Sequence, residues 1–190
     1  MRKTRTHERV SGRTAGLVGS SVIMQAPGCS GGASVWIVDL RSVAVELLDR
    51  LPANRTLGLS VEEVHDGVGR AALPVSEGVR NVIGALHSSG IAALADAAAL
   101  TAVLSVSPNE AMARRLQPLG VRARLTFHRP VRGIAIASCM LDAPSRAELG
   151  SLFEGHDESA RLTTVTTIDG EQAPRAAEGE FDWVIRLAPS

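Results

Sequence analysis

One acidic side chain stands inside an almost continuously apolar stretch of this sequence. Asp96 is the only charged residue in the segment 88–108. A lone ionised carboxylate among apolar groups is unfavourable by several kcal/mol unless it is paired or hydrogen-bonded. Three placements are open: Asp96 points to solvent, forms a structural ion pair or hydrogen bond, or lies at a cavity where its basicity is used.

The start of the same segment offers a second kind of chemistry. If a helix begins near Ser88, Ser89 and Gly90, its first amide N–H groups point outward and carry a partial positive charge. Such amides can bind a carbonyl oxygen that becomes anionic during a reaction, as in an oxyanion hole. Gly90 would let a ligand approach the backbone closely.

The spacing between these two groups has a geometric consequence. Asp96 lies about two helical turns beyond the amides, roughly 10 Å along the axis. One helix is therefore not expected to bring its own amides and its own carboxylate to one reacting carbon. A second copy of the chain could supply the missing half, so the spacing hints at a site between subunits.

The segment that carries both groups has the length and the Ala- and Leu-rich composition of a helix. We predict Ser88 or Ser89 as its N-cap, with Pro108 just past its end. Because the helix is apolar on nearly all sides, it should be buried on most of them.

The rest of the chain is rich in strands. An earlier helix is predicted over 38–52, capped by Asp39 and ended by Pro52, with Glu46 and Arg50 one turn apart. Asp66 and Gly67 indicate a hairpin between strands 57–65 and 68–75. Later strands are predicted at 120–130, 134–142, 159–170 (ending in an Asp-Gly turn) and 179–189, with a short helix at 145–153 opened by a capping box of Ser145 and Glu148.

Two of the later strands show clear alternation. Val121, Ala123, Leu125 and Phe127 alternate with polar residues, which predicts a half-buried strand. In the last strand the apolar side carries Phe181, Trp183, Ile185 and Leu187. Strands outnumber helices and hairpin links dominate, so we predict an α+β fold with an antiparallel sheet around one buried helix.

Composition excludes several classes of function. The 190 residues are 45% hydrophobic and 21% charged with zero net charge, which is typical of a soluble globular protein and indicates no nucleic-acid partner. No uninterrupted apolar run reaches the roughly 20 residues of a membrane helix, so no membrane partner is expected. Cys29 and Cys139 are read as free thiols in a cytoplasmic protein. The histidines match no metal-ligand spacing, so no metal is expected.

The N-terminal part differs from the rest. Residues 1–33 are predicted to form a disordered extension, with an export signal as the alternative, and residues 34–190 a single domain. Gly28–Gly32 matches the nucleophile-elbow pattern around Ser30, but no strand and helix flank it, so we interpret it as a linker.

The motif around Asp96 resembles that of hot-dog-fold acyl-CoA thioesterases, especially the phenylacetate-degradation type. Asn81, Gly84, His87 and Asp96 keep the order and spacing of that family over "NVIGALHSSGIAALADAA". The segment "LTFHRPVRGIAIASCMLD" is also similar to the strand–Arg-Pro–turn–strand part of such proteins. The resemblance covers roughly 39–187. Ser88 and Ser89 stand where the family has two glycines.

The resemblance implies a hot-dog fold and a thioester hydrolase. Asp96 would be the general base or nucleophile, amides near Ser88 and Ser89 would hold the carbonyl oxygen, and Asn81 and His87 would orient water or thioester. The substrate would be a CoA or acyl-carrier thioester with no other cofactor. The site would lie between subunits of a homodimer or a dimer of dimers.

Two other functions stay open at this point. The same fold could carry a dehydratase or hydratase, with His87 and Asp96 moving protons, or a non-catalytic acyl-binding protein whose site Ser88 and Ser89 have closed. Four arginines are candidates for CoA phosphates or, alternatively, belong to a solvated strand face: Arg122, Arg124, Arg129 and Arg132.

Overall fold

The computed structural model describes residues 39–189. The predictions for residues 1–33, including Cys29 and the segment around Ser30, lie outside the described residues. The elements in chain order are α1 (Leu40–Asp49), α2 (Pro52–Leu57), β1 (Ser60–His65), β2 (Val68–Pro74), the 3₁₀ turn η1 (Glu77–Val79), α3 (Ser88–Leu104), α4 (Glu110–Arg115), β3 (Leu116–Phe127), β4 (Ile134–Met140), α5 (Ala143–Phe153), β5 (Ala160–Gly170) and β6 (Ala173–Leu187).

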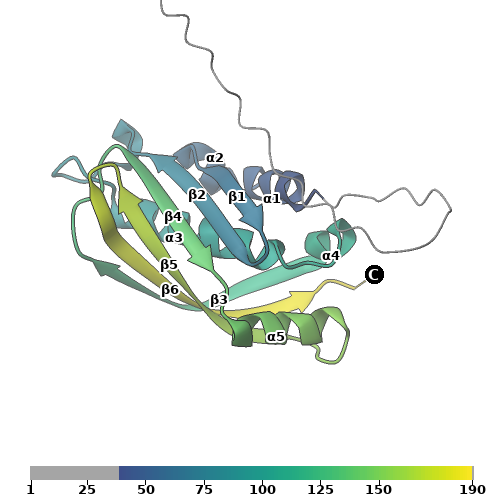
Figure 1. Ribbon diagram of the computed structural model, residues 1–190. Helices are drawn as coiled ribbons and strands as arrows, with labels where there is room; N and C mark the ends of the chain where they lie inside the picture. Colours follow the sequence, from purple (N-terminus) through teal and green to yellow (C-terminus); the bar gives the residue numbers. More distant parts are fainter. Residues whose placement is uncertain (1–38, 190) are drawn as a thin grey trace, which may run out of the picture. The chain divides into compact units, whose positions relative to one another are not determined.

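The strands form one antiparallel sheet that curves around α3 (Figure 1). Their order is β1-β2-β4-β5-β6-β3, so β1 and β3 are the two edges. Helix α3 contacts every strand, β2 and β4 most of all. The predicted α+β architecture, an antiparallel sheet around one long helix, is confirmed.

Very small residues let the sheet approach α3 closely. A Cβ atom at Gly69 of β2 would overlap the backbone nitrogen of Ala102 and the carbonyl oxygen of Ala98. Nearer the start of the helix, a Cβ at Gly179 of β6 would lie 2.7 Å from the Cβ of Ala95. The helix backbone therefore packs directly against the backbone of β2, and the methyl group of Ala95 packs against the backbone of β6.

Local signals in the sequence are confirmed at several points. Asp66 and Gly67 have φ angles of 39° and 72° and form the β1–β2 turn. The Asp39 carboxylate accepts a hydrogen bond from the Ser42 amide at 3.1 Å and caps α1, and Glu46 pairs with Arg50. Residues 57–59 are not part of β1, because Pro52 opens the short helix α2, which ends at a left-handed Gly58.

Three terminal assignments from the sequence were wrong. The N-cap of α3 is His87 rather than Ser88 or Ser89, and the N-cap of α5 is Asp142, whose carboxylate accepts from the Ser145 amide at 2.8 Å. The turn after β5 comes after Gly170, which still pairs with Ala173, so the Asp-Gly pair ends the strand instead of forming the turn. Helix α4, capped by Asn109, was not predicted.

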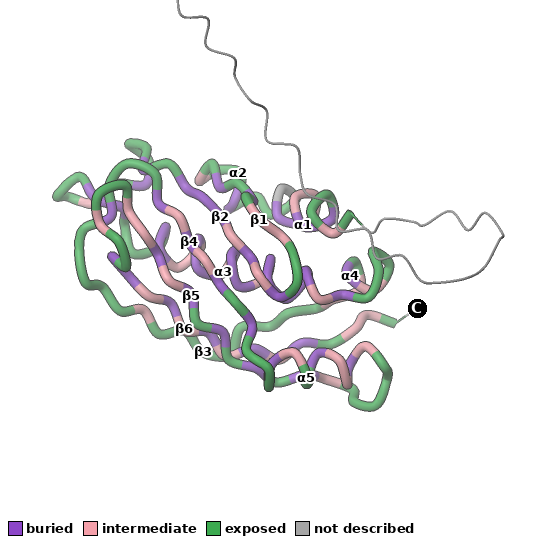
Figure 2. Tube along the Cα trace, in the orientation of Figure 1, coloured by how far each residue is buried: buried purple, intermediate pink, exposed green. Residues whose placement is uncertain are grey.

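Strand β3 differs most from its prediction. Of the four alternating apolar residues, only Leu125 is partly buried against the core, whereas Val121 and Phe127 are 62% and 55% exposed. Figure 2 shows β3 green over nearly its whole length. A register shift between Gly120 and Arg122 displaces Val121, and α3 barely contacts β3. The apolar side of this edge strand is therefore not covered by any part of the chain that the structure describes.

The close approach at Gly69 predicts a specific loss of stability. Gly69→Ala should lower the free energy of unfolding by about 1–3 kcal/mol, because the new methyl group meets helix backbone that cannot move aside. Chemical denaturation followed by circular dichroism measures this. The matched control is Gly150→Ala in α5, where nothing lies within 4 Å of the new Cβ. That variant should gain about 0.5–1 kcal/mol from helix propensity, and an equal loss in both variants would contradict the packing argument.

Candidate active site

One side of α3 is left open by the sheet. The residues of this helix that are not fully buried are Ser88, Ser89, Ala92, Ala93, Asp96 and Leu100. Most of them follow one another at intervals of three or four residues, which places them on one face of the helix. Asp96 lies in the middle of this open face.

Asp96 is half-buried and has no polar partner. Among residues 39–189 no side chain or backbone group donates a hydrogen bond to its carboxylate, and no cation pairs with it. Burial alone raises the pKa of this carboxyl from 3.8 to about 6. Of the three placements predicted for Asp96, the structural ion pair or hydrogen bond is therefore not found among the described residues. What the helix presents is a carboxylate of unusually high basicity for an aspartate.

His87 holds the start of α3. Its Nδ1 accepts a hydrogen bond from the Ser89 amide at 3.2 Å and lies 2.9 Å from the Ser89 hydroxyl. A ring nitrogen that accepts carries no proton, so the neutral imidazole has its proton on Nε2. Nε2 is therefore the ring atom left for a ligand, and it is a donor.

The amides at the start of α3 are not all free. Ser89 donates to His87, and Ile91 donates to the His87 carbonyl oxygen at 3.1 Å. Within the described chain the amides of Ser88 and Gly90 have no recorded acceptor. The cap thus occupies the Ser89 amide, and its role as a donor to a ligand stays a prediction.

The two predicted glycines have structural roles. Gly90 is buried, and a Cβ there would lie 2.6 Å from Leu86 Cδ1, so the absent side chain makes room for packing and not for a ligand. Gly84 has a φ of 72° in the loop before α3, and its amide donates to the carbonyl oxygen of Asn81 at 2.9 Å.

Asn81 organises this loop. Its Oδ1 accepts hydrogen bonds from the amides of Ile83 at 3.1 Å and Ala85 at 3.0 Å. Its Nδ2 has no recorded partner among residues 39–189. The turn role that is ordinary for asparagine is therefore present, and one polar atom of the side chain is left over.

A groove of about 510 Å³ lies beside the N-terminus of α3. It brings together three of the predicted residues, Asn81, His87 and Ser88, with Ile91 from the first turn of the helix. The opposite wall is formed by the end of β3 and the segment after it: Phe127, His128, Arg129, Pro130 and Val131. Asp96 does not line this groove. The carboxylate and the amides are thus separated, as the spacing in the sequence predicts.

Sequence reasoning missed the part that Phe127 and His128 play in this wall. Phe127 was assigned to a half-buried strand, and His128 was regarded as one of several scattered histidines. The signal that could have revealed this role is the loop that follows these two residues. The Leu86 amide donates to the Val131 carbonyl at 2.8 Å, and Arg132 Nη2 donates to the Ile83 carbonyl at 3.0 Å. These bonds join the two loops into one wall.

The four candidate arginines fall into two groups. Arg122 pairs with Asp182 at 2.7 Å and Arg124 with Glu180 at 3.2 Å, so both are already neutralised by β6. Arg129 and Arg132 have no acidic partner within 4 Å in the described chain. Arg129 lines the groove beside α3 and the neighbouring hollow that it shares with Arg132. Only this second group is available to an anionic ligand.

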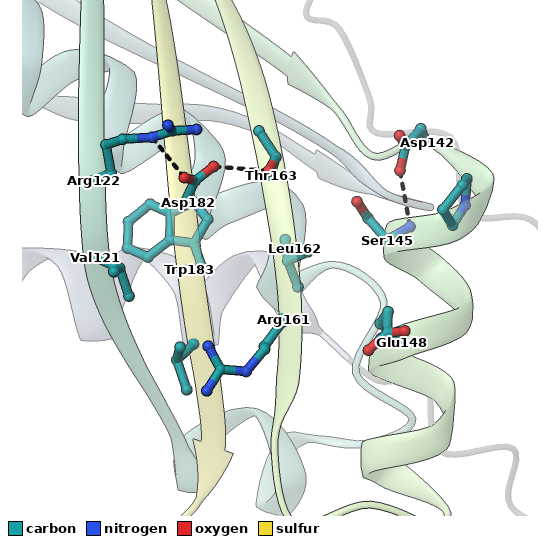
Figure 3. Close-up of a pocket in the computed structure, with 12 residues that line it drawn as sticks. Val121, Arg122, Asp142, Ser145, Glu148, Arg161, Leu162, Thr163, Asp182 and Trp183 are labelled. Atoms are coloured by element: carbon teal, nitrogen blue, oxygen red, sulfur yellow. Dashed lines mark hydrogen bonds and ion pairs between the residues drawn. The ribbon is translucent and has the colours of Figure 1, made fainter.

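A separate hollow of about 570 Å³ lies between α5 and the strands β5, β6 and β3 (Figure 3). Figure 3 shows its upper part occupied by the Arg122–Asp182 pair, and Thr163 donates to Asp182 at 2.8 Å. This hydrogen bond, together with Arg122, holds the pKa of the Asp182 carboxyl below its usual range. None of the predicted site residues lines this hollow, so its size does not make it the candidate site.

Comparisons with known proteins bear on the fold. No family model and no curated protein matches the chain. Among solved structures, a Pseudomonas aeruginosa protein of unknown function, described as a probable thioesterase, is 23% identical with a TM-score of 0.63, over 77% of this chain and 95% of its own. A thioesterase family protein from Silicibacter pomeroyi is 16% identical with a TM-score of 0.61, over 78% and 99%. A Chlorobaculum tepidum protein of unknown function is 19% identical with a TM-score of 0.64, over 79% and 94%.

This chain has the hot-dog fold. The resemblance stated from the sequence is thereby confirmed at the level of the fold, which these thioesterase-like structures share. Identities below a quarter carry no catalytic residue from one protein to another. No helix among the described residues is long and apolar enough to cross a membrane.

The raised pKa of Asp96 predicts an unusual dependence of stability on pH. Between about pH 4 and pH 6 the unfolded chain has released this proton and the folded chain still holds it, so the free energy of unfolding falls as pH rises. Asp96→Asn removes this fall in the free energy of unfolding, because an asparagine side chain does not release a proton. The variant should be more stable than the wild type by about 2–3 kcal/mol at pH 7, a difference that vanishes below about pH 4.

Denaturation at a series of pH values measures this difference. The matched control is Asp142→Asn, because hydrogen bonds from Ser145 lower the pKa of Asp142 and its charged form already suits the folded state. This control should gain no stability at pH 7. Equal stability of Asp96→Asn and wild type across the whole pH range would contradict the assignment.

Proposed function

We propose that this protein hydrolyses acyl thioesters. The observation that carries the proposal is Asp96, an unpaired, half-buried carboxylate in the middle of the open face of α3, with its pKa raised to about 6. Such a group is ionised at neutral pH and is basic enough to take a proton from water. The names of two neighbours with the same fold include the word thioesterase, which supports the class of reaction.

The proposed site is built from two copies of the chain. Asp96 lies about 12 Å along the helix axis from Ser88, at 1.5 Å per residue, which is too far for both to meet one carbonyl group. The exposed apolar residues of β3, Val121 and Phe127, and its unpaired backbone edge favour a second copy there. A partner packed on this side would bring its groove toward the open face of α3.

The proposed reaction then runs as follows. Asp96 takes a proton from a water molecule, whose oxygen attacks the thioester carbonyl carbon. The partner's amides at the start of α3, those equivalent to Ser88 and Gly90, stabilise the oxyanion. Collapse of the tetrahedral intermediate breaks the C–S bond, and the thiolate leaves with the proton that Asp96 had taken. In the alternative route, Asp96 attacks the carbonyl carbon directly, the C–S bond breaks and the thiolate leaves. Water then hydrolyses the resulting anhydride to the free acid and the Asp96 carboxylate, and the proton it releases goes to the thiolate.

We propose CoA as the carrier of the acyl group. Arg129 and Arg132 lie beside the groove at the start of α3 and have no acidic partners in the part of the chain that the structure describes, so we regard them as available to phosphates. A CoA thioester would lie with its phosphates at these arginines and its thioester toward the amides of α3.

The main test of the function is hydrolysis of acyl-CoA thioesters. Wild-type protein should hydrolyse members of a panel from acetyl- to dodecanoyl-CoA, with kcat/KM rising as pH passes through about 6 because the base must be ionised. Asp96→Asn should lower kcat by about 10²–10⁴-fold, measured by release of free thiol. The control Asp157→Asn, at an exposed position of the loop before β5, should keep wild-type activity. Full activity in Asp96→Asn would overturn the mechanism.

The carrier can be tested with a truncated substrate. Arg129→Ala should raise KM for acyl-CoA about tenfold, since it removes one charge-assisted contact worth about 1.5 kcal/mol. It should leave KM for the matching acyl-pantetheine, which lacks the nucleotide phosphates, unchanged. The control Arg122→Ala removes an arginine already paired with Asp182 and should change neither value. An equal rise with both substrates in Arg129→Ala would contradict the phosphate contact.

A further inference from the structure

A second groove lies at the other end of the open face of α3. It has a volume of about 190 Å³ and is bounded by α1, the C-terminal half of α3, α4 and the start of β3. Every residue that lines it is apolar, and we call this set the leucine pocket: Leu47, Leu48, Leu51, Leu100, Val103, Leu104, Ala113, Leu116 and Pro118.

The leucine pocket is aligned with Asp96. Leu100 and Val103 follow Asp96 by four and seven residues, the spacing of one helix face. They therefore lie about 6 Å and 10 Å farther along the axis, at 1.5 Å per residue. Leu100 is half-exposed although most residues near it on α3 are buried, so it forms the edge of the pocket nearest to the carboxylate.

The pocket has a floor and a mouth. Leu48, Val103 and Ala113 are almost completely buried at its base, whereas the residues around its opening are more exposed. Leu51 is 43% exposed, Pro118 is exposed, and Leu100, on the side of Asp96, is partly exposed. The floor thus belongs to the packed core, and the walls are held by α1 and α4 rather than by a loop. An apolar group entering from the Asp96 side would exchange water for contacts with preformed walls.

We propose that the leucine pocket binds the acyl chain of the thioester, and that the preferred acyl group is an alkyl chain of medium length. This inference rests on the proposed function and names the substrate class of that site. A volume of about 190 Å³ accommodates roughly six water-sized groups at about 30 Å³ each, hence a chain of about six carbons.

The lining residues also determine which acyl groups the pocket excludes. Among residues 39–189, no side chain in the pocket carries a donor or an acceptor, so a hydroxyl or carboxyl group at the far end of the acyl chain would be buried without a hydrogen bond. The same lining residues include no aromatic ring that could stack on an aryl group. A plain alkyl chain leaves no polar group unsatisfied, and each methylene it buries should strengthen binding about fourfold.

The chain-length profile of hydrolysis tests this assignment. Wild-type kcat/KM should increase from acetyl- to hexanoyl-CoA and fall again beyond octanoyl-CoA. Leu100→Phe narrows the pocket and should lower the ratio of hexanoyl to acetyl hydrolysis at least tenfold, whereas Leu100→Ala should move the optimum to longer chains. The control Val165→Phe, at an exposed position of β5 outside the pocket, should keep the wild-type profile. If Leu100→Phe does not fold, Leu51→Trp at the mouth replaces it.

A binding measurement separates failure of this inference from failure of the proposed function. Titration calorimetry with Asp96→Asn protein compares acetyl-, butyryl- and hexanoyl-CoA, and the affinity should rise about fourfold per added methylene. If no thioester is hydrolysed but this rise is found and is lost in Leu100→Phe, the hydrolase function is wrong and the acyl pocket stands. If thioesters are hydrolysed with no dependence on chain length and binding shows no rise, the function stands and the pocket is overturned, as it would be were a partner's side chains to fill it.

Discussion

The structure depends on the close contact between α3 and the backbones of the strands around it. Gly69 and Gly179 leave no room for a side chain, and the residues of α3 that face them are the alanines Ala95, Ala98 and Ala102. Contact at this range is possible only where residues are small, so the helix is fixed in position and rotation against the sheet. A helix held on these sides has one face left, and whatever stands on that face is presented in a defined direction.

Asp96 occupies that face, and this explains how an apolar helix tolerates a carboxylate. The side chain is desolvated enough to raise its pKa to about 6, yet it is not enclosed by the chain. Complete burial would keep the group protonated at neutral pH, and full exposure would leave it a weak base. The same open face continues into the leucine pocket, so one helix presents a base and an apolar wall in sequence. The order of residues on α3 therefore corresponds to the order of groups along a thioester, from carbonyl to alkyl end.

The sequence predicts those parts of the structure that depend on near neighbours. The hairpin at Asp66 and Gly67, the cap at Asp39 and the burial of α3 follow from local residue types and periodicity. Strand β3 is predicted wrongly because alternation shows that a strand has an apolar side but not what covers it, and residues 39–189 do not cover it. The contacts of Gly90 and Ser89 could not be predicted for a related reason. Gly90 is small because Leu86 lies against it, and the Ser89 amide is used by His87, and neither contact follows from spacing alone.

The effect of Ser88 and Ser89 on the proposed site depends on which amide donors the start of α3 has to supply. A side chain does not change the hydrogen-bonding capacity of its own amide, so replacing glycine by serine removes no donor. The cap decides which donors are left: His87 takes the Ser89 amide through Nδ1 and the Ile91 amide through its carbonyl oxygen. The Ser89 hydroxyl lies against the same Nδ1 at 2.9 Å, so its side chain is held at the histidine. Only the Ser88 side chain lines the groove, and the room that a thioester finds beside it is therefore set by one hydroxymethyl group rather than two.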